Sequence, residues 1–392
     1  MSTKRLIGLA VGAAAAILCA ACAPVDPPAP RPEETPPSEQ APVEKLTLMP
    51  TPAPEPTGPK DRIEAAIEHV RRRDLRTSNG FWTVFHGILG LGPSVTLLNE
   101  DTGQRVNAVD YIANGGELRG LVFLPTKYGL DVQSFADGQG VGQGHQDQFI
   151  AEMAQWGMPP DKKFVVFGRD YTFMDFVRHA QMRARVTQKQ ELSWAILVIG
   201  QYLGTDISWT NGHGEQLHFE DLVRYELDAS VENAPCGGTH RLFGLTWVYH
   251  LHLQKGGAKT GVWKEIADKT AKYRDLAKKY QNPDGSFSTS FFRGPGNAAD
   301  KQLRINTTGH TLEWLALALS PDELKEPWMQ EAANALALMI LEMQGSPIEG
   351  GSLYHAVHGL LIYYARVYDR HWLGPNEPPI PLPPEWAPAE GE

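Results

Sequence analysis

The hydrophobic pattern between residues 60 and 373 predicts pairs of helices. One member of a pair carries its apolar residues on one side only, as Ile63, Ile67 and Val70 do in the first segment. The other member is apolar on nearly every side, and such a helix must be enclosed by other helices. The predicted helices are 61–73, 81–91, 106–113, 145–156, 171–187, 192–203, 219–227, 239–254, 262–280, 312–319, 328–343 and 355–368.

This alternation predicts an all-α fold, an (α/α)6 toroid in which an outer ring of helices surrounds an inner ring. Its pairs span about fifty residues each. An open helical solenoid is the alternative. Residues 118–144 predict an insertion with a strand at Leu121–Leu124 and a glycine-rich loop. The six inner helices are expected to begin at or contain Phe81, His145, Leu192, Thr239, Leu312 and His355.

The first 22 residues have the pattern of an export signal. Lys4 and Arg5 precede an apolar run that is too short for a membrane span. The small residues before Cys22 resemble a bacterial lipoprotein cleavage box. That resemblance implies a lipid anchor on Cys22, and Ala23 after it implies an outer membrane lipoprotein facing the periplasm. A secreted protein is the alternative.

Composition divides the rest of the chain. Proline recurs through residues 23–59, which predicts a disordered linker, and residues 374–392 predict a proline-rich tail. The remaining 60–373 is long enough for one large core. A net charge of -10 disfavours a nucleic-acid partner. With Cys19 removed and Cys22 acylated, Cys236 has no disulfide partner in the chain, so it is either a small buried hydrophobe or a functional thiol.

The segment from Tyr280 to Phe287 contains Gln281, Gly285 and Phe287. It resembles the turn repeated in the toroids of the terpenoid cyclase and protein prenyltransferase superfamily, and Gln344 to Tyr354 resembles it more loosely. The resemblance implies the fold, with the glutamine capping a neighbouring helix. The acidic motif that holds a diphosphate in that superfamily is absent, so no reaction is implied.

Histidines recur at or near the predicted starts of the inner helices. If these helices run parallel, their histidines meet at one mouth of the toroid, beside the glycine-rich loop. The alternative is that each histidine only caps a helix or forms hydrogen bonds within the core. The histidines are His86, His145, His240, His310, His355 and His358.

Cys236 and His240 precede and begin the central helix, for which Thr239 is the expected N-cap. With His310 as a third ligand they predict a zinc site that leaves a fourth position to water. The metal-free alternative uses His240 or His310 as a general base, with Glu313 orienting His310. Glu191 is the expected carboxylate on the opposite wall.

Trp82, Trp194 and Trp314 are expected near the entrances of inner helices, where they would suit a glycan or isoprenoid ligand unless they belong to the core. The sequence therefore favours an exported enzyme that acts on an envelope glycan or lipid-linked substrate. A hydrolase, lyase or cyclase-like reaction is equally compatible with these residues. The alternative is a non-catalytic lipoprotein that binds a glycan or protein partner.

Overall fold

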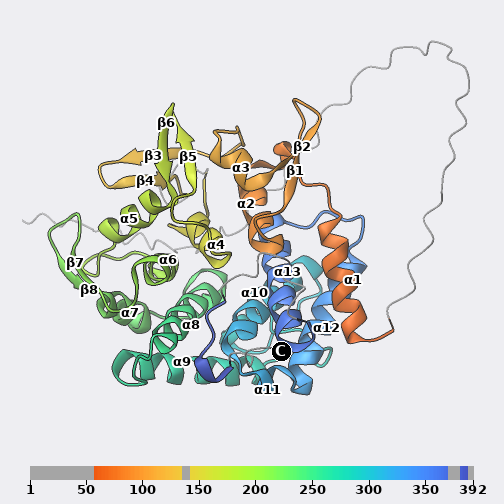
Figure 1. Cartoon of the computed structure of the whole chain (residues 1–392). Coiled ribbons are helices and arrows are strands. Elements are labelled where there is room, and N and C mark those ends of the chain that lie inside the picture. Colours follow the sequence, from red (N-terminus) through yellow and green to blue (C-terminus); the bar gives the residue numbers. More distant parts are fainter. Residues whose placement is uncertain (1–56, 135–141, 370–379, 387–392) are drawn as a thin grey trace, which may run out of the picture. The chain divides into compact units, whose positions relative to one another are not determined.

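The computed structural model describes residues 57–134, 142–369 and 380–386, and helices dominate it (Figure 1). Within these residues there are thirteen α-helices, and strands occur only in two-stranded hairpins. The predicted all-α class is therefore confirmed. The predicted signal, Cys22, nearly all of the linker and part of the glycine-rich loop lie outside the described residues.

Six helices form the buried centre of the described chain. Each contacts the next along the sequence, and the last also packs against the first. Their side chains are buried on nearly every side, as the apolar pattern predicts. They are α2 (Gly80–Leu91), α4 (Gln148–Gln155), α6 (Ser193–Leu203), α8 (Thr239–Gln254), α10 (Lys301–Ala318) and α13 (Gly350–Val367).

The amphipathic helices alternate with these six along the chain. In α9, for example, Val262, Ile266 and Tyr273 are buried while the lysines of the same helix lie on its other side. The amphipathic helices are α1 (Pro59–Arg71), α3 (Ala108–Ala113), α5 (Phe173–Arg183), α7 (Phe219–Asp228), α9 (Gly261–Lys279) and α12 (Pro327–Glu342). A single turn, α11 (Pro321–Leu324), precedes α12.

Four antiparallel hairpins join some of these helices. The strands are β1 (Thr96–Asn99), β2 (Gln104–Asn107), β3 (Phe123–Thr126), β4 (Gly129–Val132), β5 (Lys163–Val166), β6 (Arg169–Thr172), β7 (Ser208–Thr210) and β8 (Gln216–His218). Only a strand near β3 was expected from the sequence.

Three of the hairpins lead directly into an amphipathic helix that begins in the same way. The helices α3, α5 and α7 each carry an aspartate at their third position, and in α5 and α7 its carboxylate accepts the backbone N–H of the capping residue. This contact satisfies one of the amide groups that a helix start leaves unpaired. A hairpin followed by a capped helix is thus an internal repeat that the helical periodicity did not reveal.

Two predicted helix starts lie too far along the chain, and one predicted N-cap is wrong. Helix α13 begins at Gly350 and not at His355. Helix α10 begins at Lys301 and not at Leu312, because polar Thr307, Thr308 and His310 are buried inside it and interrupt the apolar pattern. Helix α8 has Gly238 as its N-cap, while the Thr239 hydroxyl donates a hydrogen bond to the Cys236 carbonyl at 2.9 Å.

The tail is also more ordered than its composition predicts. Residues 380–386 pack against the helices: the Pro381 carbonyl accepts a hydrogen bond from buried His250, and Glu385 pairs with Lys259 at 2.7 Å. Trp386 lies against the Arg366 guanidinium. The other residues of the predicted tail lie outside the described ranges.

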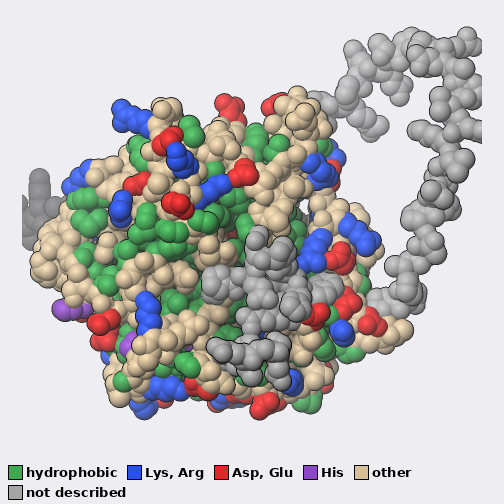
Figure 2. All heavy atoms as spheres, in the orientation of Figure 1, with side chains coloured by type: hydrophobic (Ala, Val, Ile, Leu, Met, Phe, Trp, Pro, Cys, Tyr) green, Lys and Arg blue, Asp and Glu red, His purple; other side chains and the backbone are tan. Residues whose placement is uncertain are grey.

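Two further observations concern the surface of the protein and the hydropathy of its described helices. Figure 2 shows hydrophobic side chains gathered on the viewed face over α4, α5 and α6, with charged side chains around them. None of the described helices has both the length and the hydropathy needed to cross a membrane.

Candidate metal centre

Five of the predicted histidines lie together, and each comes from a different part of the chain. Their rings form a continuous series, with centroid separations of 5.0 Å for His145–His240, 5.1 Å for His240–His310, 4.2 Å for His310–His355 and 5.3 Å for His355–His86. His86, His310 and His355 lie within α2, α10 and α13, so the prediction that the histidines mark helix starts is wrong for these three. The convergence itself is present.

Four of these rings are held by a hydrogen bond on the same nitrogen. The Nδ1–H of His86 donates to the Trp82 carbonyl at 2.7 Å, and that of His310 donates to the Asn306 carbonyl at 2.8 Å. Both acceptors lie one helical turn before the histidine, so the helix itself fixes each ring.

The other two rings are held by carboxylates. His145 donates from Nδ1 to Glu191 Oε2 at 2.8 Å, and His355 donates from Nδ1 to Glu313 Oε2 at 2.7 Å. A carbonyl or carboxylate on Nδ1 leaves Nε2 as the nitrogen with a free lone pair, which is the usual arrangement of a metal-binding histidine.

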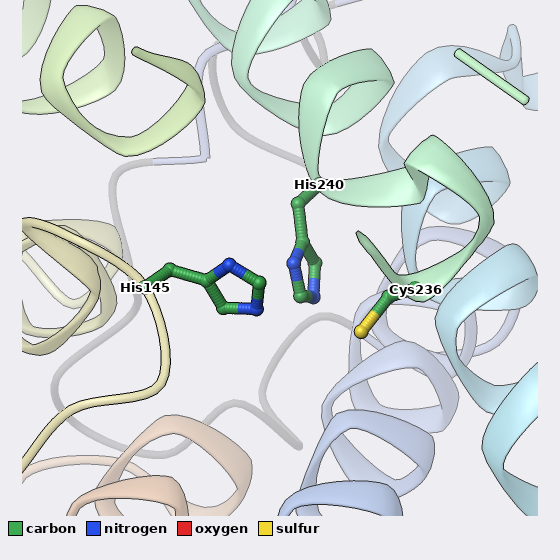
Figure 3. A group of neighbouring side chains, drawn as sticks. All are labelled: His145, Cys236 and His240. Atoms are coloured by element: carbon green, nitrogen blue, oxygen red, sulfur yellow. The ribbon is translucent and has the colours of Figure 1, made fainter. Parts of the chain in front are cut away.

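Ligand atoms from this cluster approach one another in three overlapping sets. Within each set the atoms lie within 4.8 Å of one another. The sets are His145, Cys236 and His240; then His240, His310 and His355; and then His86, Glu152 and His355. Figure 3 shows the first set, with the His145 and His240 rings close together and the Cys236 sulfur pointing towards them.

Two buried side chains in the cluster have polar atoms without hydrogen-bond partners among the described residues. Neither ring nitrogen of His240 has a nitrogen or oxygen partner among the described residues, although the residue is only 4% exposed; the polar group beside it is the Cys236 thiol. Glu152 is completely buried, and its Oε2 is also without a partner. Leaving such groups unsatisfied costs about 1–3 kcal/mol each, and a bound cation would take the lone pair of one His240 nitrogen and a lone pair of Glu152 Oε2.

Cys236 is presented by an unusual turn. The 3-10 turn Pro235–Gly238 contains three successive left-handed residues, Cys236, Gly237 and Gly238, with φ values of 50°, 64° and 82°. A Cβ on Gly237 would lie 2.1 Å from the Phe291 ring, so the turn requires glycine there. Cys236 has a side chain that disfavours this region, and a left-handed conformation costs a non-glycine residue about 1–2 kcal/mol. Strain of this kind is typical of functional positions.

Without a bound cation, the electrostatics of the cluster favour neutral His86 and His355, a thiolate at Cys236 and a protonated His145. Burial lowers the pKa of His86 and of His355 to about 3, so both are neutral at pH 7 and able to bind a metal. Burial opposes ionisation of Cys236, but His240 and His310 outweigh it and hold the pKa of the thiol well below its usual value. Burial also opposes protonation of His145, yet Glu191 and Cys236 raise the pKa of His145 to about 10.

Glu313 acts on different histidines from the one expected. Its two oxygens accept hydrogen bonds from His355 at 2.7 Å and His358 at 2.6 Å, both on α13, and not from His310 on its own helix. Two glycines allow this approach: a Cβ on Gly359 would lie 2.8 Å from the Glu313 backbone nitrogen, and one on Gly309 would lie 2.7 Å from the Ala356 Cβ. His358 therefore lies beside the cluster and belongs to none of the three ligand sets.

The predicted tryptophans divide between the cluster and the core. The ring centroid of Trp82 is 4.1 Å from that of His86, and the ring of Trp194 is 4.7 Å from His240, so both border the cluster. Trp314 is fully buried against Phe292, and its Nε1 donates to Thr246 at 3.1 Å. The expectation that Trp314 lies at an entrance is wrong.

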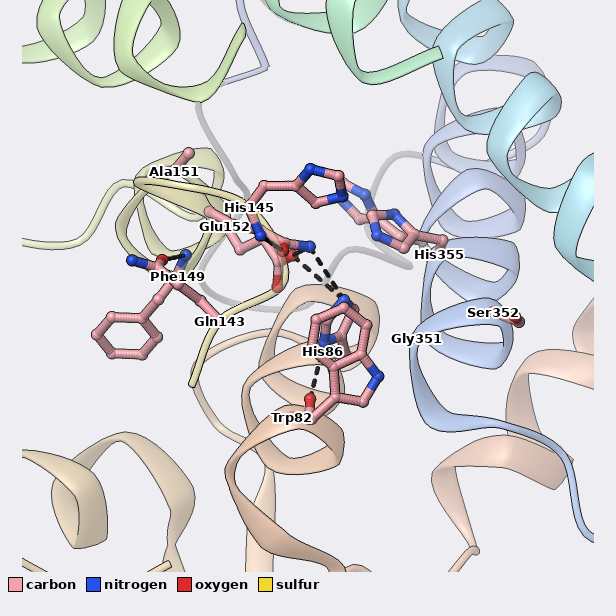
Figure 4. A network of polar contacts seen from close by, with 12 residues as sticks. Trp82, His86, Gln143, His145, Phe149, Ala151, Glu152, Gly351, Ser352 and His355 are labelled. Atoms are coloured by element: carbon pink, nitrogen blue, oxygen red, sulfur yellow. Dashed lines mark hydrogen bonds and ion pairs between the residues drawn. The ribbon is translucent and has the colours of Figure 1, made fainter. Parts of the chain in front are cut away.

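Glu152 and Gln148 are site residues that were not predicted from the sequence. Gln148 Nε2 lies 2.9 Å from Glu152 Oε1 and 3.2 Å from His86 Nε2, so it joins the two residues (Figure 4). The signal that could have found them is their spacing of four residues, which places Gln148 and Glu152 on one side of a helix directly after His145. The surrounding residues of α4 are also buried, which marks this side as interior.

A separate groove holds none of these residues. It has a volume of about 910 Å³ and is lined by Thr77, Glu100 and Arg119 together with Val165 and Phe167 of the β5–β6 hairpin. The predicted site residues are therefore not part of this open surface feature.

Comparisons with known proteins give no match to a family model, to a curated protein or to a solved structure. The assignment of this cluster depends on its geometry alone: five histidines, a thiol and a buried carboxylate whose ligand atoms converge.

Proposed function

We propose that the cluster binds a transition-metal ion and that the protein is a metal-dependent enzyme. The observation that carries the proposal is the set of converging Nε2, Sγ and carboxylate atoms, combined with the fixed Nδ1 atoms on the outer side of the rings. Sulfur, imidazole and carboxylate ligands fit zinc, whose catalytic sites use three protein ligands and leave one position open. Bound zinc would supply an activated water or polarise a substrate oxygen.

The chain's own residues would orient the ligands and the substrate. Glu191 and Glu313 fix the His145 and His355 rings through Nδ1, so Nε2 is the nitrogen of each ring that would bind the metal. On His145 the ion would displace a proton. Trp82 and Trp194 lie beside the histidines, and the partly exposed Trp82 suits stacking on a glycan ring or contact with an isoprenoid chain. We therefore propose an envelope glycan or a lipid-linked molecule as the substrate class.

The proposed architecture is an (α/α)6 toroid of the terpenoid cyclase and prenyltransferase type. Two observations support it. The first is that the six buried helices contact one another in succession and the last packs against the first. In addition, Gln281 Nε2 donates to the Trp328 carbonyl at 2.7 Å at the start of α12, and Phe287 lies against the Trp328 ring. This contact joins the glutamine to the start of a neighbouring helix, although it reaches a carbonyl and not one of the free amides that a cap would satisfy.

The metal proposal is tested by metal analysis of the purified protein. We expect zinc to remain after dialysis and its content to fall in the variants Cys236→Ser and His240→Ala. The matched control is His213→Ala, because His213 lies in the exposed turn of the β7–β8 hairpin. A wild-type protein that binds no transition metal would refute the proposal.

The enzyme proposal is tested by activity. The metal-loaded protein should convert an envelope polysaccharide or lipid-linked saccharide, and His240→Ala should not. Saturable binding of a glycan without turnover would instead support the alternative, a non-catalytic lipoprotein that binds a glycan or protein partner.

We also propose that the protein is an outer membrane lipoprotein held through Cys22 and facing the periplasm. The support is the signal-like sequence of residues 1–22 and its resemblance to a lipoprotein cleavage box. The variant Cys22→Ala should leave the membrane fraction on cell fractionation. Membrane association that is unchanged in this variant would refute the anchor, whereas export without any acylation would support the secreted alternative.

A further inference from the structure

The cluster offers more ligands than one zinc ion can use. Seven side chains contribute to the three sets, whereas a zinc ion takes four ligands, or five in a transition state. The first and third sets share no residue: one consists of His145, Cys236 and His240, and the other of His86, Glu152 and His355. Each of these two sets has the three protein ligands of a catalytic zinc site.

The third set lies deeper than the first and is built as a site of its own. The side chains of His86 and Glu152 are 1% and 0% exposed, compared with 12% for His145 in the first set. His86 Nε2 is 3.5 Å from Glu152 Oε1, and His355 lies on the other side of His86 (Figure 4). Glu152 Oε2 has no hydrogen-bond partner among the described residues, which is an independent sign that a cation belongs there.

Outer contacts hold all three ligands of this deeper set. The Trp82 carbonyl fixes His86, Glu313 fixes His355, and Gln148 donates to Glu152 at 2.9 Å. Such contacts are the usual support of metal ligands. The second set joins the other two, because it shares His240 with the set that contains Cys236 and His355 with the deeper set, and His310 is its third member.

We infer that the protein binds two metal ions, an outer one at His145, Cys236 and His240 and an inner one at His86, Glu152 and His355. This inference rests on the proposed metal-binding function. Two neighbouring ions can stabilise the attacking and the leaving oxygen of a displacement reaction together. The two sites also differ in chemistry: the outer one contains a thiolate, and the inner one has only nitrogen and oxygen ligands.

The test combines metal stoichiometry with cobalt substitution of the purified full chain. The wild type should bind two ions, and the cobalt form should show a thiolate-to-cobalt charge-transfer absorption. Glu152→Gln should bind one ion and keep that absorption, whereas Cys236→Ser should bind one ion and lose it. Glu331→Gln, at an exposed position of α12, is the matched control and should bind two.

Several outcomes separate this inference from the proposed function. One ion in the wild type, lost completely from either variant, would mean a single shared site and would overturn the inference while leaving the proposed function intact. Two ions in Glu152→Gln would place the inner ion elsewhere and would also overturn it. No ion in the wild type would overturn both. Circular dichroism reports folding, and if Glu152→Gln does not fold, His86→Asn removes a ligand of the same inner site.

Discussion

His250 shows how one buried residue outside the metal cluster couples folding to pH. Its Nδ1 donates to the Pro381 carbonyl at 2.9 Å, and burial, aided by the charge of Arg366, lowers the pKa of His250 to about 3. Glu385 and Trp386 of the tail also lie near the His250 ring. In the unfolded chain this histidine takes up a proton near pH 6.5. Above that pH His250 is uncharged in both the folded and the unfolded chain, so its titration does not affect the free energy of unfolding. As the pH falls from about 6.5 towards 3, only the unfolded chain takes up the proton, and folding is progressively disfavoured.

We predict that His250→Gln reduces the loss of stability on acidification. At about pH 5 the single histidine should account for about 2 kcal/mol, and glutamine keeps a donor for Pro381 without titrating. Urea unfolding at about pH 7.5 and pH 5 measures the difference. His213→Gln in an exposed turn is the control and should leave the pH dependence as in the wild type. An unchanged pH dependence in His250→Gln would contradict the prediction.

Glu226 of α7 is a second residue whose contacts extend across several helices. Its carboxylate is fully buried and accepts hydrogen bonds from Leu192 N at 2.9 Å, from the Ser193 hydroxyl at 2.8 Å and from Arg241 Nε at 2.8 Å. It thereby holds the start of α6 and a buried arginine of α8.

Removing this carboxylate should be strongly destabilising. Glu226→Ala leaves the Arg241 charge unpaired and the Leu192 amide and Ser193 hydroxyl unsatisfied, so we predict a loss of about 3–5 kcal/mol in the free energy of unfolding. Chemical denaturation monitored by circular dichroism provides the measurement. The exposed Glu331→Ala should change the free energy by less than about 0.5 kcal/mol. A similar small effect in Glu226→Ala would mean that the network does not support α6.

At the residue scale the sequence predicted which histidines meet but not how they are held. The recurrence of His86, His240, His310 and His355 in buried helices was enough to predict their convergence. The acceptors on Nδ1 were not predictable, because Glu313 reaches α13 only through close packing of two helices that are distant in the sequence. Glu152 was missed because a lone glutamate in a helical pattern is normally solvated.

At the element scale, the contact between α10 and α13 positions Glu313. Gly359 and Gly309 allow the two backbones to approach, and an added methyl group on Gly359 would lie 2.8 Å from Glu313 N. We predict that Gly359→Ala separates the helices at a cost of about 1–3 kcal/mol and weakens metal binding about 10- to 100-fold by displacing Glu313 from His355.

Thermal unfolding and chelator competition measure these two effects. Gly58→Ala is the control, since an added Cβ there meets no atom within 4 Å. If Gly359→Ala binds metal as tightly as the wild type, Glu313 is not a positioning residue for the site.

The elements themselves were largely predictable where periodicity is strong. The long apolar pattern placed α6 and α8 within a residue or two of their observed bounds. The hairpins were missed because their strands are only three or four residues long and partly exposed, which is too short for an alternating pattern to be recognised. The early part of α10 was missed because threonine, asparagine and glycine are weak helix formers, and tertiary packing decides their conformation.

At the scale of the whole molecule, metal binding should stabilise the folded chain. The ligands come from α2, α4, α8, α10 and α13 and from the segments just before α4 and α8, so an ion binds the folded state and not the unfolded one. Free zinc at 100 times its dissociation constant would add about 2.7 kcal/mol. We predict that a chelator lowers the Tm by several degrees and that added zinc restores it, as followed by calorimetry. Equal Tm values in the two conditions would contradict a bound ion.

The most direct test of the central claim is anomalous X-ray diffraction from crystals of the protein at energies above and below the zinc absorption edge. We predict anomalous density within about 2.0–2.3 Å of Cys236 Sγ and of the facing nitrogens of His145 and His240, with further density between His86, Glu152 and His355. Crystals without anomalous density at any transition-metal edge in this cluster, with the histidines instead bonded to one another or to water, would contradict the account.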